Sequence, residues 1–419
     1  MLSLELVVNE TAKVKAALAR RGGEYPVNEA LRLDARRREL IKETDTLRAR
    51  RNEVSKKIGS EKRKPSQAES DEMRAAGDKI KSDEQDLDSI KSQLEALLLT
   101  LPNLPLPDVP DGPDASGNVV VKTWGEPRNF AHAKPHWDIG TQLGIVDMEA
   151  GARITGARFY VLRGKGATLQ RALSNWFLDV HTREQGYIEI EPPYLVKRET
   201  MTGSGNLPKF ADNLFHDDES GYWLLPTAEV ALNGIHQGTI LEPGVLPLKY
   251  VARTPCFRKE KTAAGRDVRG IKRVHQFEKV EMFRYVEPER SEAALEEMVS
   301  EATVLCERLG LPYRLLKLCA GDIGFQSAKT FDIEVWSPGC QEWLEVSSLS
   351  TCTDFQARRN NTRYRAERGG PTRMPHMLNG SGLALPRVII AIIENYLQPD
   401  GSVVVPEVLR KYTGFDRIP

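Results

Sequence analysis

The architecture follows from two neighbouring stretches of sequence, YVARTPCFRKE at residues 250–260 and RVHQFEKVE at residues 273–281. Both alternate in the manner of β-strands, which places Arg258 and Glu260 on one face of the first stretch. The same alternation places every second residue of the other stretch, from Arg273 to Glu281, on one face. The polar, glycine-bearing residues 261–270 lie between them, so we expect two adjacent strands joined by a loop.

The shared face of these strands carries arginines, carboxylates and one ring, Phe277. An exposed sheet surface with ion pairs would account for the charges, and such surfaces are common in antiparallel sheets. It would not account for a lone phenylalanine among charges. Arginines that hold phosphates, a ring that stacks on a base and carboxylates that bind amines account for all three residue types.

Around this pair, residues 119–419 alternate strand-like and helical runs and predict one large mixed α/β domain on an antiparallel sheet. Strands are expected at residues 187–191, 248–254, 272–285, 330–336 and 343–348, and helices at residues 167–185, 291–308 and 383–397.

Three further clusters could carry chemistry. In residues 379–387 (NGSGLALPR), glycines allow a tight turn into a buried helix whose Arg387 needs a partner or an anionic ligand. Glu345 could hold Mg²⁺, but Ser348 shares its face only if the strand bulges or ends there. Thr227 before Glu229 is, by itself, most simply the cap of a helix start.

Residues 28–99 have helix composition, with Pro65 near their middle. Apolar residues recur every seven positions in each half, the pattern of a coiled coil, although Asp83 interrupts it. We therefore expect two long helices folded back as an antiparallel hairpin with arms of about 50 Å. The heptad columns are Leu33, Leu40, Leu47 and Val54, then Met73, Ile80, Leu87 and Leu94.

The first helix of this hairpin is basic and the second is more acidic. The two faces could simply pair, or one basic flank could meet a phosphate backbone, and the residues leave both possibilities open. The basic positions include Arg36, Arg37, Arg48, Arg51 and Lys57.

A proline-rich segment separates this arm from the rest of the chain and predicts three parts: residues 1–100, a stiff linker at 101–118, and residues 119–419. Lys+Arg and Asp+Glu are both 59, so any nucleic-acid surface must be local. The scattered cysteines form no C-x-x-C pair, which disfavours zinc and disulfides. No apolar run is long enough for a membrane span, and the start lacks the features of a secretory signal.

In order, these pieces resemble the class II aminoacyl-tRNA synthetases, and specifically the seryl-tRNA synthetases, over essentially the whole chain. The three class motifs correspond to residues 169–193, to residues 257–281 and to residues 380–387. Pro386 before the arginine of the third motif and the irregular hairpin seam depart from the family pattern.

The resemblance implies an α+β fold, in which an antiparallel coiled-coil hairpin precedes a catalytic domain on a mainly antiparallel sheet flanked by helices. It implies activation of L-serine by ATP to seryl-adenylate, and transfer of the seryl group to the 3′ end of tRNA(Ser) and of tRNA(Sec). It also implies Mg²⁺ with the ATP, no zinc, a cytoplasmic homodimer, and tRNA held through its long variable arm.

The resemblance further implies residue roles. It assigns catalysis to Arg258, Arg387 and Glu345, and Mg²⁺ to Glu345 and Ser348. The serine contacts are Thr227, Ala228, Glu229, Arg258, Glu281 and Ser381. The ATP contacts are Arg258, Lys259, Glu260, Arg273, Val274, Phe277, Glu345, Val346, Ser347, Ser348 and Arg387. The tRNA contacts are Arg36, Arg37, Arg48, Arg51 and Lys57.

Three alternatives remain open. A ligase that loads a carrier protein would not need the long basic arm. A non-enzymatic RNA-binding relative would be expected to lack some of Arg258, Glu281, Glu345 and Arg387, and all four are present. A coiled-coil scaffold would leave the pattern after residue 118 unexplained.

Overall fold

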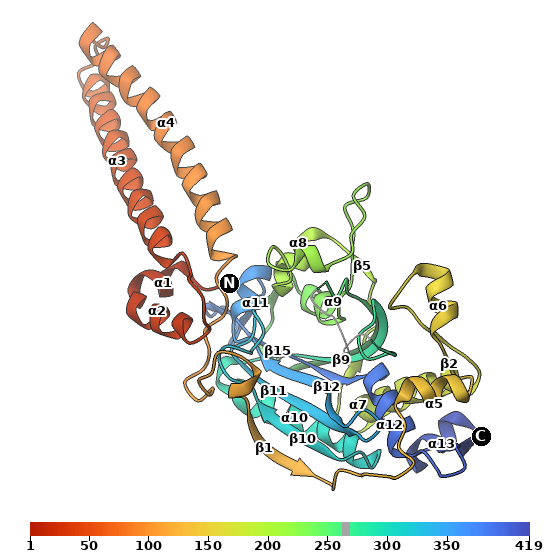
Figure 1. Ribbon diagram of the computed structural model, residues 1–419. Coiled ribbons are helices and arrows are strands. Elements are labelled where there is room, and N and C mark those ends of the chain that lie inside the picture. The colour runs from red at the N-terminus through yellow and green to blue at the C-terminus, as the bar shows by residue number, and fades with distance from the viewer. Residues whose placement is uncertain (262–268) are drawn as a thin grey trace. The chain divides into compact units, whose positions relative to one another are not determined.

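The computed structural model describes residues 1–261 and 269–419, and these form two compact units (Figure 1). The smaller unit contains residues 2–19 and 23–102, and the larger contains residue 1, residues 20–22 and residues 103–419. Most of the expected loop at 261–270 falls on residues 262–268, outside the described residues. Among the described helices, none is both long and apolar enough to cross a membrane.

The smaller unit contains the expected helical hairpin. Helices α3 (Val27–Ser60) and α4 (Gln67–Leu98) form its arms, and α1 (Leu4–Asn9) and α2 (Thr11–Ala19) precede them. Ser66 caps α4, and Glu69 returns the bond to the Ser66 backbone, so that two free N–H groups at the helix start are satisfied. The chain therefore turns where Pro65 predicted it.

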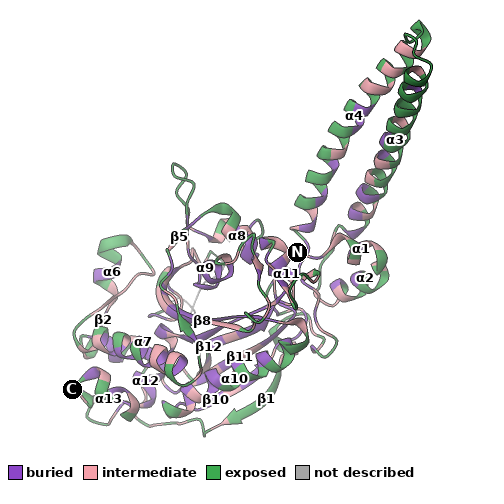
Figure 2. Cartoon of the chain, turned by 180° about the vertical axis from the view of Figure 1, so that it is seen from behind, coloured by how far each residue is buried: buried purple, intermediate pink, exposed green. Residues whose placement is uncertain are grey.

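The heptad columns form the seam between the two arms. Leu40 is fully buried and Leu94 is 3% exposed, while the outer faces of α3 and α4 are exposed (Figure 2). Asp83 is also buried in this seam, and Lys79 Nζ lies 2.5 Å from its carboxylate. The long side chain of Lys79 thus supplies the partner that a buried charge requires.

In the larger unit, eight described strands form one sheet in the order β1-β10-β11-β12-β15-β9-β8-β4. Neighbours run antiparallel except β4 and β8, which confirms the expected mainly antiparallel sheet. The strands are β1 (Val119–Trp124), β4 (Ile188–Glu189), β8 (Leu248–Phe257), β9 (Gln276–Val286), β10 (Tyr313–Lys317), β11 (Lys329–Ser337), β12 (Glu342–Thr351) and β15 (His376–Ala384).

One face of this sheet is covered by α7 (Lys165–Arg183), α10 (Ser291–Arg308) and α12 (Leu385–Asn395) (Figure 1). Val280 and Met282 of β9 belong to their common hydrophobic core. The intervening residues Lys279 and Glu281 point from the opposite face, because side chains alternate along a strand. The other face of the sheet is covered in part by α9 (Glu229–Gly234) and α11 (Phe355–Asn360), and the site lies beside them on that face.

Shorter elements complete the described part of the larger unit. Its other helices are α5 (His136–Gln142), α6 (Met148–Thr155), α8 (Arg198–Ser204), α9 (Glu229–Gly234), α11 (Phe355–Asn360) and α13 (Glu407–Thr413). Its other strands are β2 (Val146–Asp147), β3 (Val161–Leu162), β5 (Leu195–Val196), β6 (Trp223–Leu224), β7 (Ile240–Leu241), β13 (Arg363–Arg365), β14 (Thr372–Arg373), β16 (Val403–Val404) and β17 (Arg417–Ile418).

The glycine-rich residues 379–384 differ from expectation, because they end strand β15 instead of forming a turn. A Cβ on Gly380 would lie 2.8 Å from the Leu349 side chain, and one on Gly382 would lie 2.3 Å from His181 Nε2. These glycines therefore serve close packing in a buried strand. The helix after them starts at Leu385, two residues later than expected.

The proline-rich segment is attached to the larger unit from Asn103 onward. The Asn103 backbone N–H donates to Phe325 O at 2.9 Å, and its side-chain amide donates to Cys352 O at 2.8 Å. The first part of the segment is therefore held by the fold as well as by its prolines.

Candidate active site

The open face of the sheet bears a cavity of about 440 Å³. The cavity gathers most of the residues that the sequence singled out. Its lining includes Thr227, Glu229, Arg258, Glu260, Arg273, Val274, Phe277, Glu281, Glu345, Val346, Ser348, Ser381 and Arg387.

Three expected contact residues do not line this cavity. Ala228 is buried in a neighbouring apolar cluster. The Lys259 ammonium lies 5.5 Å from the centre of the Phe215 ring. The Ser347 hydroxyl donates to Ser381 O at 2.6 Å, so it supports the strand that carries Ser381.

One group of side chains combines cations with an aromatic ring. The Arg258 guanidinium lies 5.3 Å from the centre of the Phe277 ring, and its Nε donates to Pro226 O at 3.1 Å. Arg273 lies 3.4 Å from the Glu260 carboxylate. A flat ring beside fixed guanidinium groups suits a base joined to phosphates.

Arg387 projects from the first turn of α12. Its guanidinium donates to Glu345 O at 2.7 Å and lies 3.6 Å from the Glu345 carboxylate. Its side chain is 21% exposed, so the expected buried arginine is partly open to the cavity. These contacts hold it in place and leave the rest of its fork of donors for an anion.

A β-bulge in β12 places Glu345 and Ser348 on the same cavity. Ile333 pairs with Ser347 and Glu334 pairs with Glu345, so Val346 is an extra residue without a direct partner on β11. A bulge shifts the side-chain alternation by one position. The sequence predicted that Glu345 and Ser348 could serve one site only if the strand bulged or ended between them, and the bulge meets that condition.

A third oxygen donor lies beside these two. Asp332 faces Ser348 across the β11–β12 pairing and also lines the cavity. Its Oδ1 is buried and accepts no hydrogen bond from the described residues. Burial and the neighbouring Glu345 carboxylate raise the pKa of Asp332 well above its ordinary value. A hard divalent cation such as Mg²⁺ prefers such oxygen ligands, so these residues fit it.

A second group of side chains surrounds Glu281, which is 2% exposed. Lys279 forms an ion pair with it, and the Thr227 hydroxyl donates to it at 3.2 Å. Ser381 pairs with Glu281 across β15 and β9. This small region of a charged acceptor and hydroxyl groups is suited to a short polar substrate.

Glu229 lies in the same region and is 6% exposed. It accepts hydrogen bonds from Gln356 at 2.7 Å and Asn379 at 3.1 Å. Burial raises the pKa of Glu229 to about 7, and the charge of Glu281 adds to the rise. The Glu229 backbone N–H also donates to the Thr227 hydroxyl at 3.2 Å. The expected helix cap at Thr227 is wrong, because α9 begins after Ala228, which is its N-cap residue and forms no side-chain cap.

Sequence reasoning did not assign roles to Lys279, Asp332 or Asn379, although all three line the cavity. Lys279 was identifiable, because it alternates with Phe277 and Glu281 on one strand. Asn379 begins the cluster at residues 379–387, but its chemistry was not considered there. Asp332 reaches the cavity through strand pairing that is remote in sequence, and no local signal marked it.

The expected RNA contacts of the smaller unit lie along α3. Arg36, Arg37 and Arg48 form ion pairs with acidic residues of the hairpin. Arg51 and Lys57 are exposed, and neither forms an ion pair within the described ranges 1–261 and 269–419. Of the five expected contacts, these two are therefore the most open to a phosphate backbone.

Comparison with known proteins finds matches to both units. A model of the seryl-tRNA synthetase N-terminal domain matches residues 1–105. A model of the tRNA synthetase class II core domain (G, H, P, S and T) matches residues 211–396. The chain is 55% identical over 416 residues to a serine–tRNA ligase of Thermomicrobium roseum, which covers 99% of this chain and 94% of that protein.

Two further relatives agree. A serine–tRNA ligase of Chloroflexus aurantiacus is 52% identical over 417 residues, with coverage of 99% of this chain and 98% of that protein. A crystal structure of seryl-tRNA synthetase from Pyrococcus horikoshii complexed with ATP is similar with a TM-score of 0.95 and 37% identity. That match covers 100% of this chain and 99% of the other.

Proposed function

Because the chain belongs to the seryl-tRNA synthetase family, we propose that it activates L-serine with ATP and transfers the seryl group to the 3′ end of tRNA(Ser). The cavity carries this proposal, since it combines arginines and a ring with a buried acid and hydroxyl groups in about 440 Å³. The neighbour from Pyrococcus horikoshii was solved with ATP, which supports a nucleotide in this place.

In the first step, a serine carboxylate oxygen attacks the α-phosphorus of ATP, the bond to the bridging oxygen breaks, and pyrophosphate leaves. The attacking carboxylate is already ionised, so the step needs no general base. Arg258 neutralises charge that develops on the α-phosphate, and positioning with charge stabilisation accounts for the catalysis.

In the second step, a ribose hydroxyl at the tRNA 3′ end attacks the seryl carbonyl. The ester to the ribose forms, the bond to AMP breaks, and AMP leaves with the electron pair. The hydroxyl proton passes to the AMP phosphate. This phosphate is close to the hydroxyl, because in the adenylate it is bonded directly to the seryl carbonyl group. No covalent bond to the protein is needed.

The nucleotide contacts follow from the same residues. Phe277 stacks on the adenine, Glu260 accepts from its amino group, and Arg387 holds the γ-phosphate with help from Arg273. Arginine suits these positions because its guanidinium stays charged and offers a planar fork of donors.

Glu345 and Ser348 would hold Mg²⁺, with Asp332 as a further oxygen beside them. When bound, the ion shields the phosphate charges from one another and favours departure of pyrophosphate. The unpartnered Asp332 Oδ1 supports this proposal, because a buried carboxylate oxygen needs a donor or a cation.

Serine recognition rests on Glu281 and Ser381 for the hydroxyl, and on Thr227 and Glu229 for the α-amino group. Alanine and glycine lack the hydroxyl and forgo this hydrogen bond to a charged acceptor, so serine binds more tightly than either.

We propose residues 1–100 as the tRNA-binding part and residues 119–419 as the catalytic part. The hairpin grips the long variable arm of tRNA(Ser) by shape and backbone charge. Because such contacts do not read base edges, tRNA(Sec) is a second proposed acceptor. Free buried cysteines support a reducing compartment such as the cytoplasm.

A homodimer is proposed through the first class motif, residues 169–193. Ile188 of this motif is 56% exposed, and an exposed apolar side chain of this size supports a protein contact.

The deciding experiment is ATP–pyrophosphate exchange with each proteinogenic amino acid in turn, with and without tRNA(Ser). Exchange that depends on serine, followed by esterification of tRNA(Ser), is the expected result. Exchange with another amino acid, or transfer to a carrier protein in place of tRNA, would overturn the proposal.

A further inference from the structure

We propose that His136 is a positioning residue for ATP: together with Glu394 it holds the backbone at Ile271, so that Arg273 faces the cavity beside Arg387. The inference rests on the proposed function above. His136 does not line the cavity, and neither the class motifs nor the cavity lining includes it.

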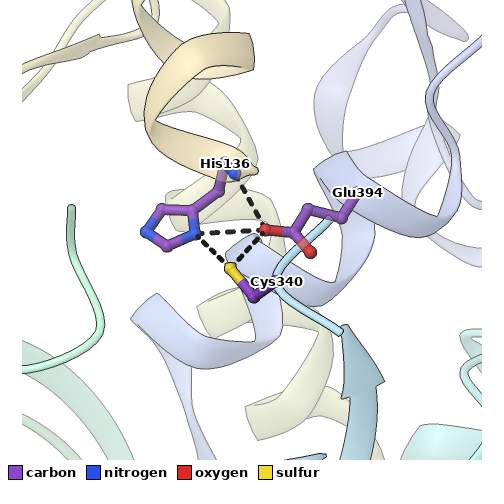
Figure 3. A group of neighbouring side chains, drawn as sticks. All are labelled: His136, Cys340 and Glu394. Carbon is purple, nitrogen blue, oxygen red and sulfur yellow. Dashed lines mark hydrogen bonds and ion pairs between the residues drawn. The ribbon is translucent and has the colours of Figure 1, made fainter. Parts of the chain in front are cut away.

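His136 and Glu394 form a buried pair, each 1% exposed (Figure 3). His136 begins α5, and its backbone N–H donates to Glu394 Oε1 at 2.8 Å. Its ring Nδ1 lies 3.1 Å from the same oxygen. On the other side of the ring, the Ile271 backbone N–H donates to Nε2 at 3.2 Å.

These partners fix the state of the ring. A backbone N–H can only donate, so Nε2 carries a lone pair and the proton of the neutral ring sits on Nδ1. Nδ1–H then donates to Glu394. Burial alone would raise the pKa of Glu394, but hydrogen bonds from His136 and Ser337 hold it below its ordinary value.

The same atoms argue against a metal ion here. Ligand atoms of His136, Cys340 and Glu394 lie within 4.8 Å of one another, a grouping that the sequence did not reveal. However, Nε2 already accepts from Ile271, and Glu394 Oε2 accepts from the Gly339 N–H at 2.9 Å. Burial, with the Glu394 charge, raises the pKa of Cys340 to about 12, which keeps it a thiol that donates to Glu394. The cluster is therefore a hydrogen-bonded brace.

This brace joins the two segments that carry the proposed phosphate arginines. Ile271 precedes Arg273 in the segment that returns to β9. Glu394 follows Arg387 on α12 by about two turns, so the two side chains share a face of that helix. Arg387 Nε also lies 3.4 Å from Lys272 O, in direct contact with the returning segment.

The fit around the ring is tight. Gly270 has φ +68, and a Cβ there would lie 2.1 Å from His136 Nε2. Only glycine lets the backbone turn at this point and approach the imidazole so closely. A displaced ring would therefore move the backbone that leads to Arg273.

The test uses the full chain with His136→Asn and His136→Gln. Asparagine keeps a donor near the Nδ1 position and loses the acceptor for Ile271, while glutamine places an oxygen near the Nε2 position. We expect His136→Asn to raise KM for ATP in serine-dependent exchange about tenfold, as for one lost buried hydrogen bond, with KM for serine nearly unchanged. His136→Gln should recover part of the loss.

A double-mutant cycle with Arg273→Ala separates positioning from general damage. If His136 acts through Arg273, His136→Asn should add little further loss in the Arg273→Ala background. Full additivity, or an equal rise in KM for serine, would overturn the inference. Gly270→Ala, which presses on the same ring, is the second variant should His136→Asn fail to fold, and it should show the same split in KM.

The matched control is His132→Asn. His132 also bonds a buried carbonyl, Leu397 O at 3.0 Å, but touches neither arginine segment. It should leave both KM values unchanged. A wild-type chain without serine-dependent exchange would contradict the proposed function, whereas an active wild type with unaltered ATP use in His136→Asn would contradict this inference alone.

Discussion

At the scale of single residues, discrimination of serine from alanine and glycine depends on one hydroxyl group. Glu281 is almost fully buried, and Lys279 and Thr227 are its partners in the empty cavity. A substrate hydroxyl can join this set and donate a further hydrogen bond to the charge, whereas a methyl group or a hydrogen atom donates none. Discrimination of this kind arises from the hydrogen bond to a charged group that only the serine hydroxyl can form.

Replacing this acceptor should separate serine use from ATP use. We expect Glu281→Ala to raise KM for serine in pyrophosphate exchange by about 10- to 100-fold, the range for a hydrogen bond to a charged group. KM for ATP should change much less.

The matched control for this variant is Glu278→Gln. Glu278 lies on the same strand, lines a different hollow and pairs with Arg253 at 3.7 Å. It should leave serine use unchanged. An equal loss of serine and ATP use in Glu281→Ala would refute the assigned role.

Glu229 should give serine binding a pH dependence. Its pKa is raised to about 7 by burial and by Glu281, and the hydrogen bond from Gln356 and the charge of Lys279 only partly oppose the rise. The other titratable group near it is Cys352, whose pKa burial also raises, so this thiol stays neutral. Below pH 7 Glu229 is therefore protonated, and a neutral acid attracts the serine ammonium less.

We expect KM for serine to rise by up to tenfold per pH unit as the pH falls below the Glu229 pKa, and to level off above it. Glu229→Gln should show a high KM that no longer varies in this range. A wild-type KM that stays flat from pH 6 to pH 8 would contradict the role, with KM for ATP measured in parallel as the reference.

Asp332 should contribute to holding the divalent cation. Its unpartnered buried oxygen motivates Asp332→Asn, which we expect to weaken Mn²⁺ binding to the chain with a non-hydrolysable ATP analogue, measured by electron paramagnetic resonance. Glu334→Gln is the control, because Glu334 lies on the same strand but pairs with Arg314 outside the cavity. Equal Mn²⁺ affinity in both variants would exclude Asp332.

At the scale of elements, the sequence predicted types and order better than local irregularities. The alternation of Phe277 and Glu281 identified strand β9 and its functional face, whereas Arg258 and Arg273 lie just outside β8 and β9, because β8 ends at Phe257 and β9 begins at Gln276. The sequence showed that Glu345 and Ser348 could share a site only if the strand ended or bulged there. It could not show the bulge at Val346 itself, because the bulge depends on how β12 pairs with β11. Residues 379–384 were misread as a turn, since glycines that permit close packing and glycines that permit turns look alike until their neighbours are known.

Gly77 in helix α4 serves neither close packing nor a turn, so it can be replaced. A Cβ on Gly77 would meet no atom within 4 Å, and its φ is not positive. Gly77→Ala should therefore stabilise the helix by about 1 kcal/mol, because alanine loses less backbone entropy. Slower amide hydrogen exchange around residue 77 is the measurement. The exposed Ala75→Gly is the matched control and should shift exchange in the opposite direction; faster exchange in Gly77→Ala would contradict the argument.

At the scale of the whole molecule, the division into two compact units divides the proposed work. Every residue proposed for serine and ATP lies in the larger unit, and every residue proposed for tRNA lies in the smaller one. Equal numbers of acidic and basic residues leave the chain without net charge, so attraction to RNA must come from local groups. Adenylate formation and tRNA recognition should therefore be separable.

The exposed cations of α3 test this separation in the full chain. Arg51 and Lys57 have no acidic partner among the described residues, so reversing both charges removes contacts to phosphate without breaking a hairpin ion pair. Arg51→Glu with Lys57→Glu should lower kcat/KM for tRNA(Ser) at least tenfold and reduce its salt dependence, while serine-dependent exchange is unchanged.

Arg36→Glu is the comparison, because Arg36 already pairs with Glu39 at 3.2 Å within the hairpin and its reversal perturbs that pair as well.

Deleting residues 30–98 should abolish tRNA charging and leave ATP–pyrophosphate exchange intact. If exchange fell along with charging in the double reversal, the arm would be acting on the catalytic unit itself. If tRNA charging survived both the double reversal and the deletion, another surface would bind the phosphate backbone. The basic flank of α3 would then be only a solvated helix face.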